Sequence, residues 1–238
     1  MTNQIKFLLF AFLLMPAFCQ AQDVTALLGG MVKSDRWLIR KDKMEEEFIG
    51  NVSYANDMYT VKADYGLSER KKQNFTLKGN VYASRKENSS KAEVTADTFF
   101  YNKTNDSGFA LPAAKKQISA VYTTQANRLK TFSNRLDFKN KFSLFELTGN
   151  CELQDINNTL YAQNMVFNTQ TGIFNAQGGR PVLWGFSPNG DYAIQADNIT
   201  AQTKEGFFKA EGKVEGWVVS AKEFPNLTQG STNGTKIF

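Results

Sequence analysis

Acidic side chains, two cysteines and a complete lack of histidine define the chemistry open to this chain. Dipeptides of a small residue followed by Asp, Asn or Gln recur along the sequence, and their carboxylates are candidates for general acid–base catalysis. Without histidine, Ser-His and Cys-His nucleophile pairs and histidine-ligated metal sites are excluded. Every unit has an acid or an amide at this position, and two units have an amide. This favours hydrogen bonding in turns over catalysis. We therefore expect no enzyme activity, no metal site and no cofactor.

These dipeptides form one half of an internal repeat. They are Ser34-Asp35, Ala63-Asp64, Ala96-Asp97, Ser133-Asn134, Ala162-Gln163 and Ala196-Asp197. In five of the six units a glycine follows the second residue of the dipeptide after 15 positions. These glycines are Gly50, Gly79, Gly149, Gly178 and Gly212. Only the unit that begins at Asp97 has a different spacing. An insertion that contains Gly108 and Pro112 separates Asp97 from the counterpart of the glycine motif at Ser119-Ala120-Val121.

Apolar and polar residues alternate around each glycine. Phe75, Leu77 and Val81 share one side of such a segment, whereas Thr76 and Lys78 occupy the other. This alternation is typical of a strand with one apolar face. The apolar parity shifts by one after each small-Asp step, which predicts a bulge or a corner there. The sequence predicts an all-β protein, an antiparallel stack of about six repeated hairpin units.

The first residues have the composition of an export signal. Lys6 precedes an apolar run at positions 7–14, and Cys19-Gln20-Ala21 offers small residues before a cut. We expect residues 1–21 to be a cleaved signal peptide, 22–33 a lead-in, 34–224 the β domain and 225–238 a polar tail. Cleavage would leave Cys151 without a disulfide partner and a net charge of +4, from 27 basic and 23 acidic residues. This mild charge comes with no nucleic-acid-binding motif, so no nucleic acid is expected.

The ordered repeat resembles the organic-solvent-tolerance A-like (OstA-like) family, which includes the periplasmic bridge proteins of lipopolysaccharide transport. The motifs that carry the resemblance lie between Ser34 and Val218. They include Phe48-Ile49-Gly50-Asn51-Val52, Leu77-Lys78-Gly79-Asn80-Val81, Leu147-Thr148-Gly149-Asn150-Cys151 and Ala210-Glu211-Gly212-Lys213-Val214. Membership implies a jelly-roll-like, V-shaped sheet stack whose apolar interior shields the acyl chains of lipopolysaccharide.

The resemblance also implies partners and a place of action. These are lipopolysaccharide or a related lipid, other OstA-like envelope components that stack end to end, and self-association into a homo-oligomer, all in the periplasm. The inward, lipid-binding face would consist of Phe48, Val52, Val61, Phe75, Leu77, Val81, Val94, Phe99, Leu136, Phe138, Phe145, Leu147, Leu160, Met165, Phe167, Phe174, Ile194, Ile199, Phe208 and Val214. Alternation alone reports burial, so a closed core is the competing interpretation of this face.

Two other classes of protein share parts of this pattern. A secreted β-solenoid that acts on polysaccharide, or an adhesin, would also be built of short repeats, but no unit concentrates acids and cations on one face. An outer-membrane β-barrel would also alternate, yet Lys236, Gly234 and Thr232 stand where its last strand needs apolar residues. We expect a periplasmic lipid-transport protein.

Overall fold

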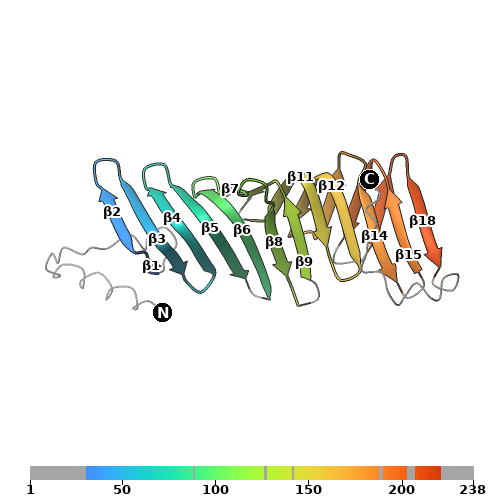
Figure 1. Ribbon diagram of the computed structural model, residues 1–238, viewed down its shortest axis with the longest axis horizontal. Coiled ribbons are helices and arrows are strands. Elements are labelled where there is room, and N and C mark those ends of the chain that lie inside the picture. Colours follow the sequence, from blue (N-terminus) through green and yellow to red (C-terminus); the bar gives the residue numbers. More distant parts are fainter. Residues whose placement is uncertain are drawn as a thin grey trace, which may run out of the picture.

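The computed structural model describes residues 31–87, 89–125, 128–140, 142–187, 190–202 and 207–220. These residues form 18 antiparallel strands joined in one hydrogen-bonded sheet, and they contain no helix. The strands lie across the long axis of the molecule and follow one another along it in sequence order (Figure 1). The predicted all-β antiparallel fold is confirmed. The predicted signal peptide and polar tail lie outside the described residues, and the domain boundaries stay predictions.

Six long strands run through the whole width of the sheet and bend near their middles. These strands are β3 (Glu45–Ala55), β4 (Tyr59–Glu69), β5 (Asn74–Glu87), β6 (Ser90–Asn102), β11 (Leu144–Gln154) and β12 (Asn158–Asn168). Each bend divides its strand into two arms. In β3, β6, β11 and β12 the two arms pair with different short strands, whereas both arms of β4 and β5 pair with the same long neighbours. The sheet therefore folds into two facing walls.

Wall A contains one arm of each long strand, at residues 45–49, 65–69, 74–78, 98–102, 144–148 and 164–168. Its short strands are β2 (Arg36–Arg40), β7 (Ser107–Leu111), β10 (Arg135–Lys139), β13 (Ile173–Gln177), β16 (Asn198–Gln202) and β17 (Phe207–Glu211). Wall B contains the other arms. Its short strands are β1 (Met31–Lys33), β8 (Ile118–Thr123), β9 (Arg128–Ser133), β14 (Val182–Ser187), β15 (Gly190–Gln195) and β18 (Glu215–Ser220). The strand β1, within the predicted lead-in, thus pairs with β3.

The bends occur where the repeated dipeptides meet the repeated glycines. The register between β3 and β4 jumps between Ile49 and Val52, where Gly50 and Asn51 oppose Asp64 alone. Gly50 and Asn51 have φ values of +77° and +46°, in the left-handed region that Gly and Asn tolerate best. The bulge predicted from the parity shift is confirmed, with its extra residue in the Gly-Asn pair.

The acids and amides of the repeat hold these bends together. The backbone N–H of Asp35 donates to the carbonyl oxygen of Gly50 at 2.9 Å, and that of Asp197 donates to Gly212 at 2.8 Å. The Asp35 carboxylate also accepts a hydrogen bond of 2.9 Å from the Asn51 amide. A Cβ atom on Gly50 would lie 2.4 Å from Asp35 Oδ2, so only glycine leaves room for this contact. These residues thus take part in hydrogen bonding at the bends, through their main-chain N–H groups and, at Asp35, through the carboxylate.

The insertion after Asp97 splits what would otherwise be one bent strand. β7 pairs with the wall A arm of β6, and β8 pairs with its wall B arm. Residues 112–117 connect the two short strands from one wall to the other. The repeat spacing fails here because this crossing takes a longer path than a Gly-Asn bulge.

Candidate functional site

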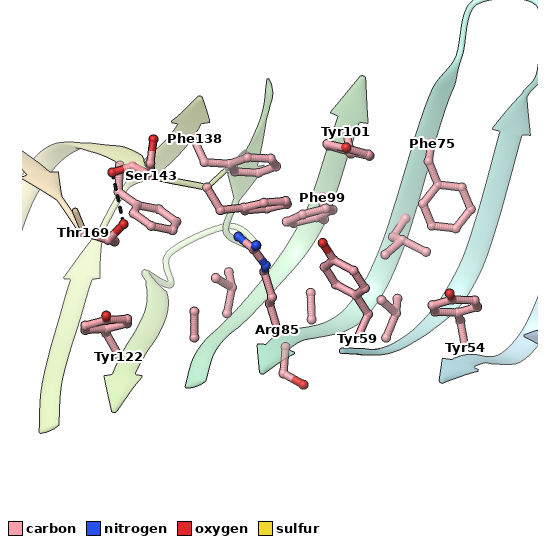
Figure 2. Close-up of a pocket in the computed structure, with 18 of the residues that line it drawn as sticks. Tyr54, Tyr59, Phe75, Arg85, Phe99, Tyr101, Tyr122, Phe138, Ser143 and Thr169 are labelled. Carbon is pink, nitrogen blue, oxygen red and sulfur yellow. Dashed lines mark hydrogen bonds between the residues drawn. The ribbon is translucent and has the colours of Figure 1, made fainter. Parts of the chain in front are cut away.

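A cavity of about 660 Å³ lies between the walls in the N-terminal part of the stack. Its lining comes from β1, β3, β4, β5, β6, β8, β10 and β11, together with turns at the wall tips. Figure 2 shows aromatic side chains entering it from several of these strands. Its volume falls within the range of about 300–1,000 Å³ that is usual for small-molecule sites.

Stacked aromatic rings form one side of the cavity. The ring of Phe138 lies 5.1 Å from that of Phe99 and 4.6 Å from that of Phe142, centroid to centroid. Tyr101 stacks on Phe142 at 5.8 Å. Phe142 belongs to a turn and has a φ of +64°, a conformation that bulky residues rarely adopt. The turn thus places this ring against the aromatic group that lines the cavity.

The wall tips give the cavity a polar mouth with one positive charge. Ser90 and Thr124 contribute from wall B, and Asn140 and Gln170 contribute from wall A. Arg85, on β5, is the one charged residue among the described residues that line the cavity. Its guanidinium carbon lies 5.6 Å from the centroid of the Phe142 ring, so the two side chains meet across the gap between the walls.

A second charged group is buried on the inner face of wall A, beside the cavity. Glu46 is only 3% exposed and forms an ion pair with Arg70. Its other carboxylate oxygen, Oε2, has no hydrogen-bond partner within the described part of the chain. Burial raises the pKa of Glu46, and the attraction of Arg70 opposes this increase without cancelling it.

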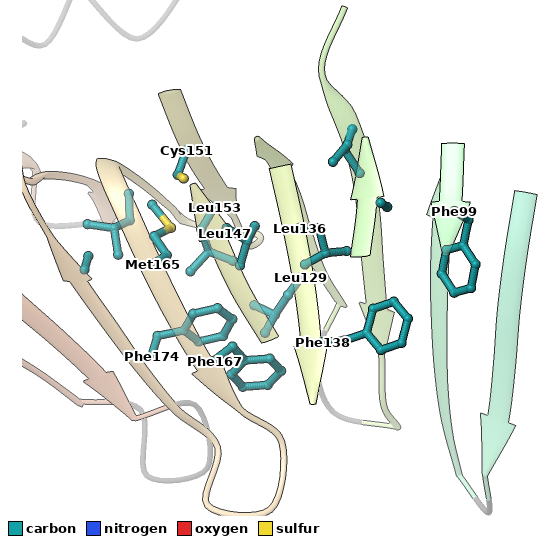
Figure 3. Packing of buried hydrophobic residues seen from close by; sticks show 14 of the residues in the cluster. Phe99, Leu129, Leu136, Phe138, Leu147, Cys151, Leu153, Met165, Phe167 and Phe174 are labelled. Atoms are coloured by element: carbon teal, nitrogen blue, oxygen red, sulfur yellow. The ribbon is translucent and has the colours of Figure 1, made fainter. Parts of the chain in front are cut away.

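The predicted inward residues divide into a cavity group and a core group. The first group lines the cavity: Phe48, Val52, Val61, Phe75, Leu77, Val94, Phe99, Phe138 and Phe145. The second group is buried in the packed interior: Val81, Leu136, Leu147, Leu160, Met165, Phe167, Phe174 and Ile199. Figure 3 shows Met165, Phe167 and Phe174 packed with Leu147 and Leu129 in this interior. The interior is thus an open groove towards the N-terminal end and a filled core further along.

The remaining three predicted residues lie near the C-terminal end of the stack. Ile194 is half-buried on β15. Phe208 is 38% exposed and stacks on Tyr192 at 6.0 Å, whereas Val214 is 54% exposed between β17 and β18. All three lie outside the cavity lining, and lipid contact by any of the predicted residues stays a prediction.

Several lining residues were not predicted. Tyr54, Tyr59, Tyr101 and Tyr122 were not selected, although each occupies an apolar position of the alternating pattern. Phe142 lies outside that pattern, in a turn, whereas Arg85 takes the inward position after Val81 and Ala83 near the end of β5. A search for all residues at inward positions would have found the tyrosines and Arg85, but no sequence signal marks Phe142.

Three observations concern metal ligands, the cysteine and the membrane. No cluster of three or more Cys, Asp or Glu residues within the described ranges could hold a metal ion. Cys151 is buried, and burial raises the pKa of its thiol to about 11. None of the described residues forms a helix long and apolar enough to cross a membrane.

The sequence and the structure of this chain were compared with those of known proteins. One solved structure that is similar is LptH, described as the LptA homologous periplasmic component of the conserved lipopolysaccharide transport device from Pseudomonas aeruginosa. It is 14% identical, the match covers 63% of this chain and 82% of that chain, and the TM-score is 0.29. No curated protein matches the chain. A family model described as LptA/(LptD N-terminal domain) LPS transport protein matches residues 31–173, more than half of the sequence and the segment that holds the cavity. This match confirms the resemblance drawn from the repeat motifs, and the chain belongs to the LptA/LptD N-terminal domain family of lipopolysaccharide transport proteins.

Proposed function

We propose that this protein binds lipopolysaccharide, or a related acylated lipid, and shields its acyl chains between the two walls during passage through the periplasm from inner to outer membrane. The observation that carries this proposal is the cavity of about 660 Å³, whose floor is apolar and whose mouth is polar. An amphiphile fits this arrangement because its chains favour the floor and its head group favours the mouth.

The energetics of such binding need no catalytic group. A buried methylene contributes about 0.8 kcal/mol, so an acyl chain with about ten buried carbons contributes about 8 kcal/mol, enough for reversible binding of a lipid. Rings such as Phe75 and Tyr122 offer broad apolar contact without a reactive side chain. The role is therefore transport, and binding and release are its only required steps.

Partners would join the ends of the stack. β2 and β17 are the outermost strands of wall A, and β1 and β18 are the outermost strands of wall B. Among the described residues, none of these four strands has a neighbour on its outer edge, so the backbone groups there can accept a strand of another sheet. We propose that related envelope transport domains, or further copies of this chain, dock there and extend the groove.

Site-specific photo-crosslinking in cells tests the lipid contact. A benzophenone side chain at Phe75, which lines the cavity, is expected to capture lipopolysaccharide. The matched control is Lys78 on the same strand, which is exposed on the outer face and should give no adduct. A second pair on β4 compares Tyr59 inside with Lys62 outside. Equal labelling on both faces, or none at the inner sites of a folded protein, would overturn the proposal.

A further inference from the structure

The cavity contains a feature that shielding of acyl chains alone does not require. Arg85 carries a full positive charge into a lining that is otherwise uncharged in the described residues. A guanidinium remains protonated at any physiological pH, so burial cannot neutralise it as it would a lysine.

The position of Arg85 is fixed from both walls. It leaves β5 near the tip of wall B and reaches the Phe142 ring at the tip of wall A, at 5.6 Å from the ring centroid. Figure 2 shows its guanidinium raised between Tyr59 and the rings of Phe99 and Phe138. The Phe142 ring lies within cation–π range of the guanidinium, whose planar fork of N–H donors suits a carboxylate or a phosphate.

The surroundings place this charge between the head and the tail of a bound amphiphile. Towards the mouth lie hydroxyl and amide side chains, including Ser90, Thr124 and Asn140. On the other side lie apolar groups such as Val94 and Phe99. An anionic group between the head group and the acyl chains of a bound lipid would contact Arg85, while the acyl chains would occupy the apolar floor of the cavity.

We infer that Arg85 is the anion-binding residue of the groove and that the protein selects lipids with a phosphate or carboxylate next to the acyl chains. This inference rests on the proposed function, because it identifies the head group of the same bound lipid.

Two lipids that differ only in the phosphate test the inference. Lauroyl lysophosphatidic acid and monolauroylglycerol are titrated into the purified protein by calorimetry, below the concentrations at which they form micelles. The wild-type protein should bind the phosphate lipid about tenfold more tightly or better, as charge-assisted hydrogen bonds allow. Inorganic phosphate alone should not bind measurably, and binding as tight as that of the lipid would make this a site for free phosphate and overturn the inference.

Three variants separate the buried charge from general electrostatics. Arg85→Gln should abolish most of the preference for phosphate while the affinity for monolauroylglycerol stays within about twofold. Arg85→Lys keeps the charge and should retain part of the preference. Lys86→Gln removes an exposed charge from the neighbouring position of the same strand and should change neither affinity.

The outcomes distinguish this inference from the function on which it rests. Equal wild-type affinity for the two lipids, or an unchanged preference in Arg85→Gln, overturns the anion site and leaves lipid binding intact. An equal loss of both affinities in Arg85→Gln assigns Arg85 a role in shaping the groove and also overturns it. If the wild-type protein binds neither lipid, the proposed function fails and the inference fails with it.

Discussion

Each bend of the sheet depends on two consecutive residues in an unusual backbone conformation. Gly79 and Asn80 have φ values of +72° and +48°, and the side chain of Asn80 donates a hydrogen bond of 2.8 Å to Asp64 Oδ2. A Cβ atom on Gly79 would lie 2.5 Å from the same carboxylate oxygen. The glycine thus meets a torsional and a steric requirement at once, which explains why it recurs at constant spacing from the acid.

The substitution Gly79→Ala should therefore destabilise the protein by about 1–3 kcal/mol. Gly66→Ala is the control, because Gly66 also lies within a long strand, does not have a positive φ, and would place its Cβ 3.5 Å or more from its neighbours. Urea denaturation of both variants measures the difference. Equal losses of stability would show that the bend does not depend on glycine.

The buried Glu46 gives the protein a pH dependence of known sign. Its pKa is raised in the folded state, mainly by burial, so the folded protein binds this proton more tightly than the unfolded chain does. The contribution of Glu46 to stability is therefore largest below its unfolded pKa of 4.5 and decreases as the pH rises through the folded value. The pKa values of Glu47 and Glu93 are lowered, mainly by hydrogen bonds from Tyr65 and Lys91 respectively. The contribution of these two groups to stability therefore increases with pH.

A comparison with Glu46→Gln isolates this contribution from those of the other carboxylates. The stability of the wild type relative to the variant should decrease between pH 4 and pH 7, measured as the difference in unfolding free energy. Gln keeps the shape of the side chain and cannot ionise. A difference that is constant with pH, or that increases, would contradict the raised pKa.

Among the elements, the short strand β10 contributes a central side chain to the packed interior. Phe138 on this strand is 1% exposed and stacks on Phe99, Tyr101 and Phe142, which belong to β6 and to a turn. β10 also bridges β7 and β11 in wall A. It therefore joins the part of the stack before the insertion to the part after it.

Phe138→Ala should lower the unfolding free energy by about 3–5 kcal/mol, as truncation of a buried phenylalanine usually does. The same change at Phe186 on β14, which is 57% exposed, should cost less than about 1 kcal/mol. Thermal or chemical denaturation provides both values. A small effect at Phe138 would mean that the neighbouring rings collapse into the space it leaves.

The strands could be predicted from the sequence better than the cavity could. Alternation at Phe75, Leu77 and Val81 reports which side chains are buried, and the constant spacing to Gly79 reports where the strands bend. Neither pattern tells whether facing side chains touch. Leu147 fills the core and Phe75 lines open space, although both occupy inward positions of the repeat. The difference depends on how far apart the walls stand, which is a property of the whole sheet.

At the scale of the molecule, nearly all pairing joins segments that are close in sequence. β14 pairs with β12 and β15, and β16 pairs with β13 and β17. Such an arrangement gives a stability that is approximately a sum over neighbouring units, as in other repeat architectures. Loss of a terminal unit should then leave the rest folded.

A chain that ends at Gln202 tests this expectation, since it lacks β17 and β18 but keeps every partner of the strands before β15. Circular dichroism should show that the β structure remains, and lauroyl lysophosphatidic acid should bind as tightly as to the full chain, because the cavity lies between Val32 and Gln170. Loss of cooperative unfolding in the shortened chain would indicate that the stack folds only as a whole.

The rows of bends mark the axis about which the two walls would rotate relative to each other. An arm of about five residues reaches about 16 Å from the bend to the wall tip, at about 3.3 Å per residue. At this arm length, a rotation of one wall by about 10° about the axis would move its tip by about 3 Å. The ladder hydrogen bonds within each wall would survive such a rotation, because each wall turns as one body. The aperture can therefore widen for a bulkier guest without any strand leaving its partner.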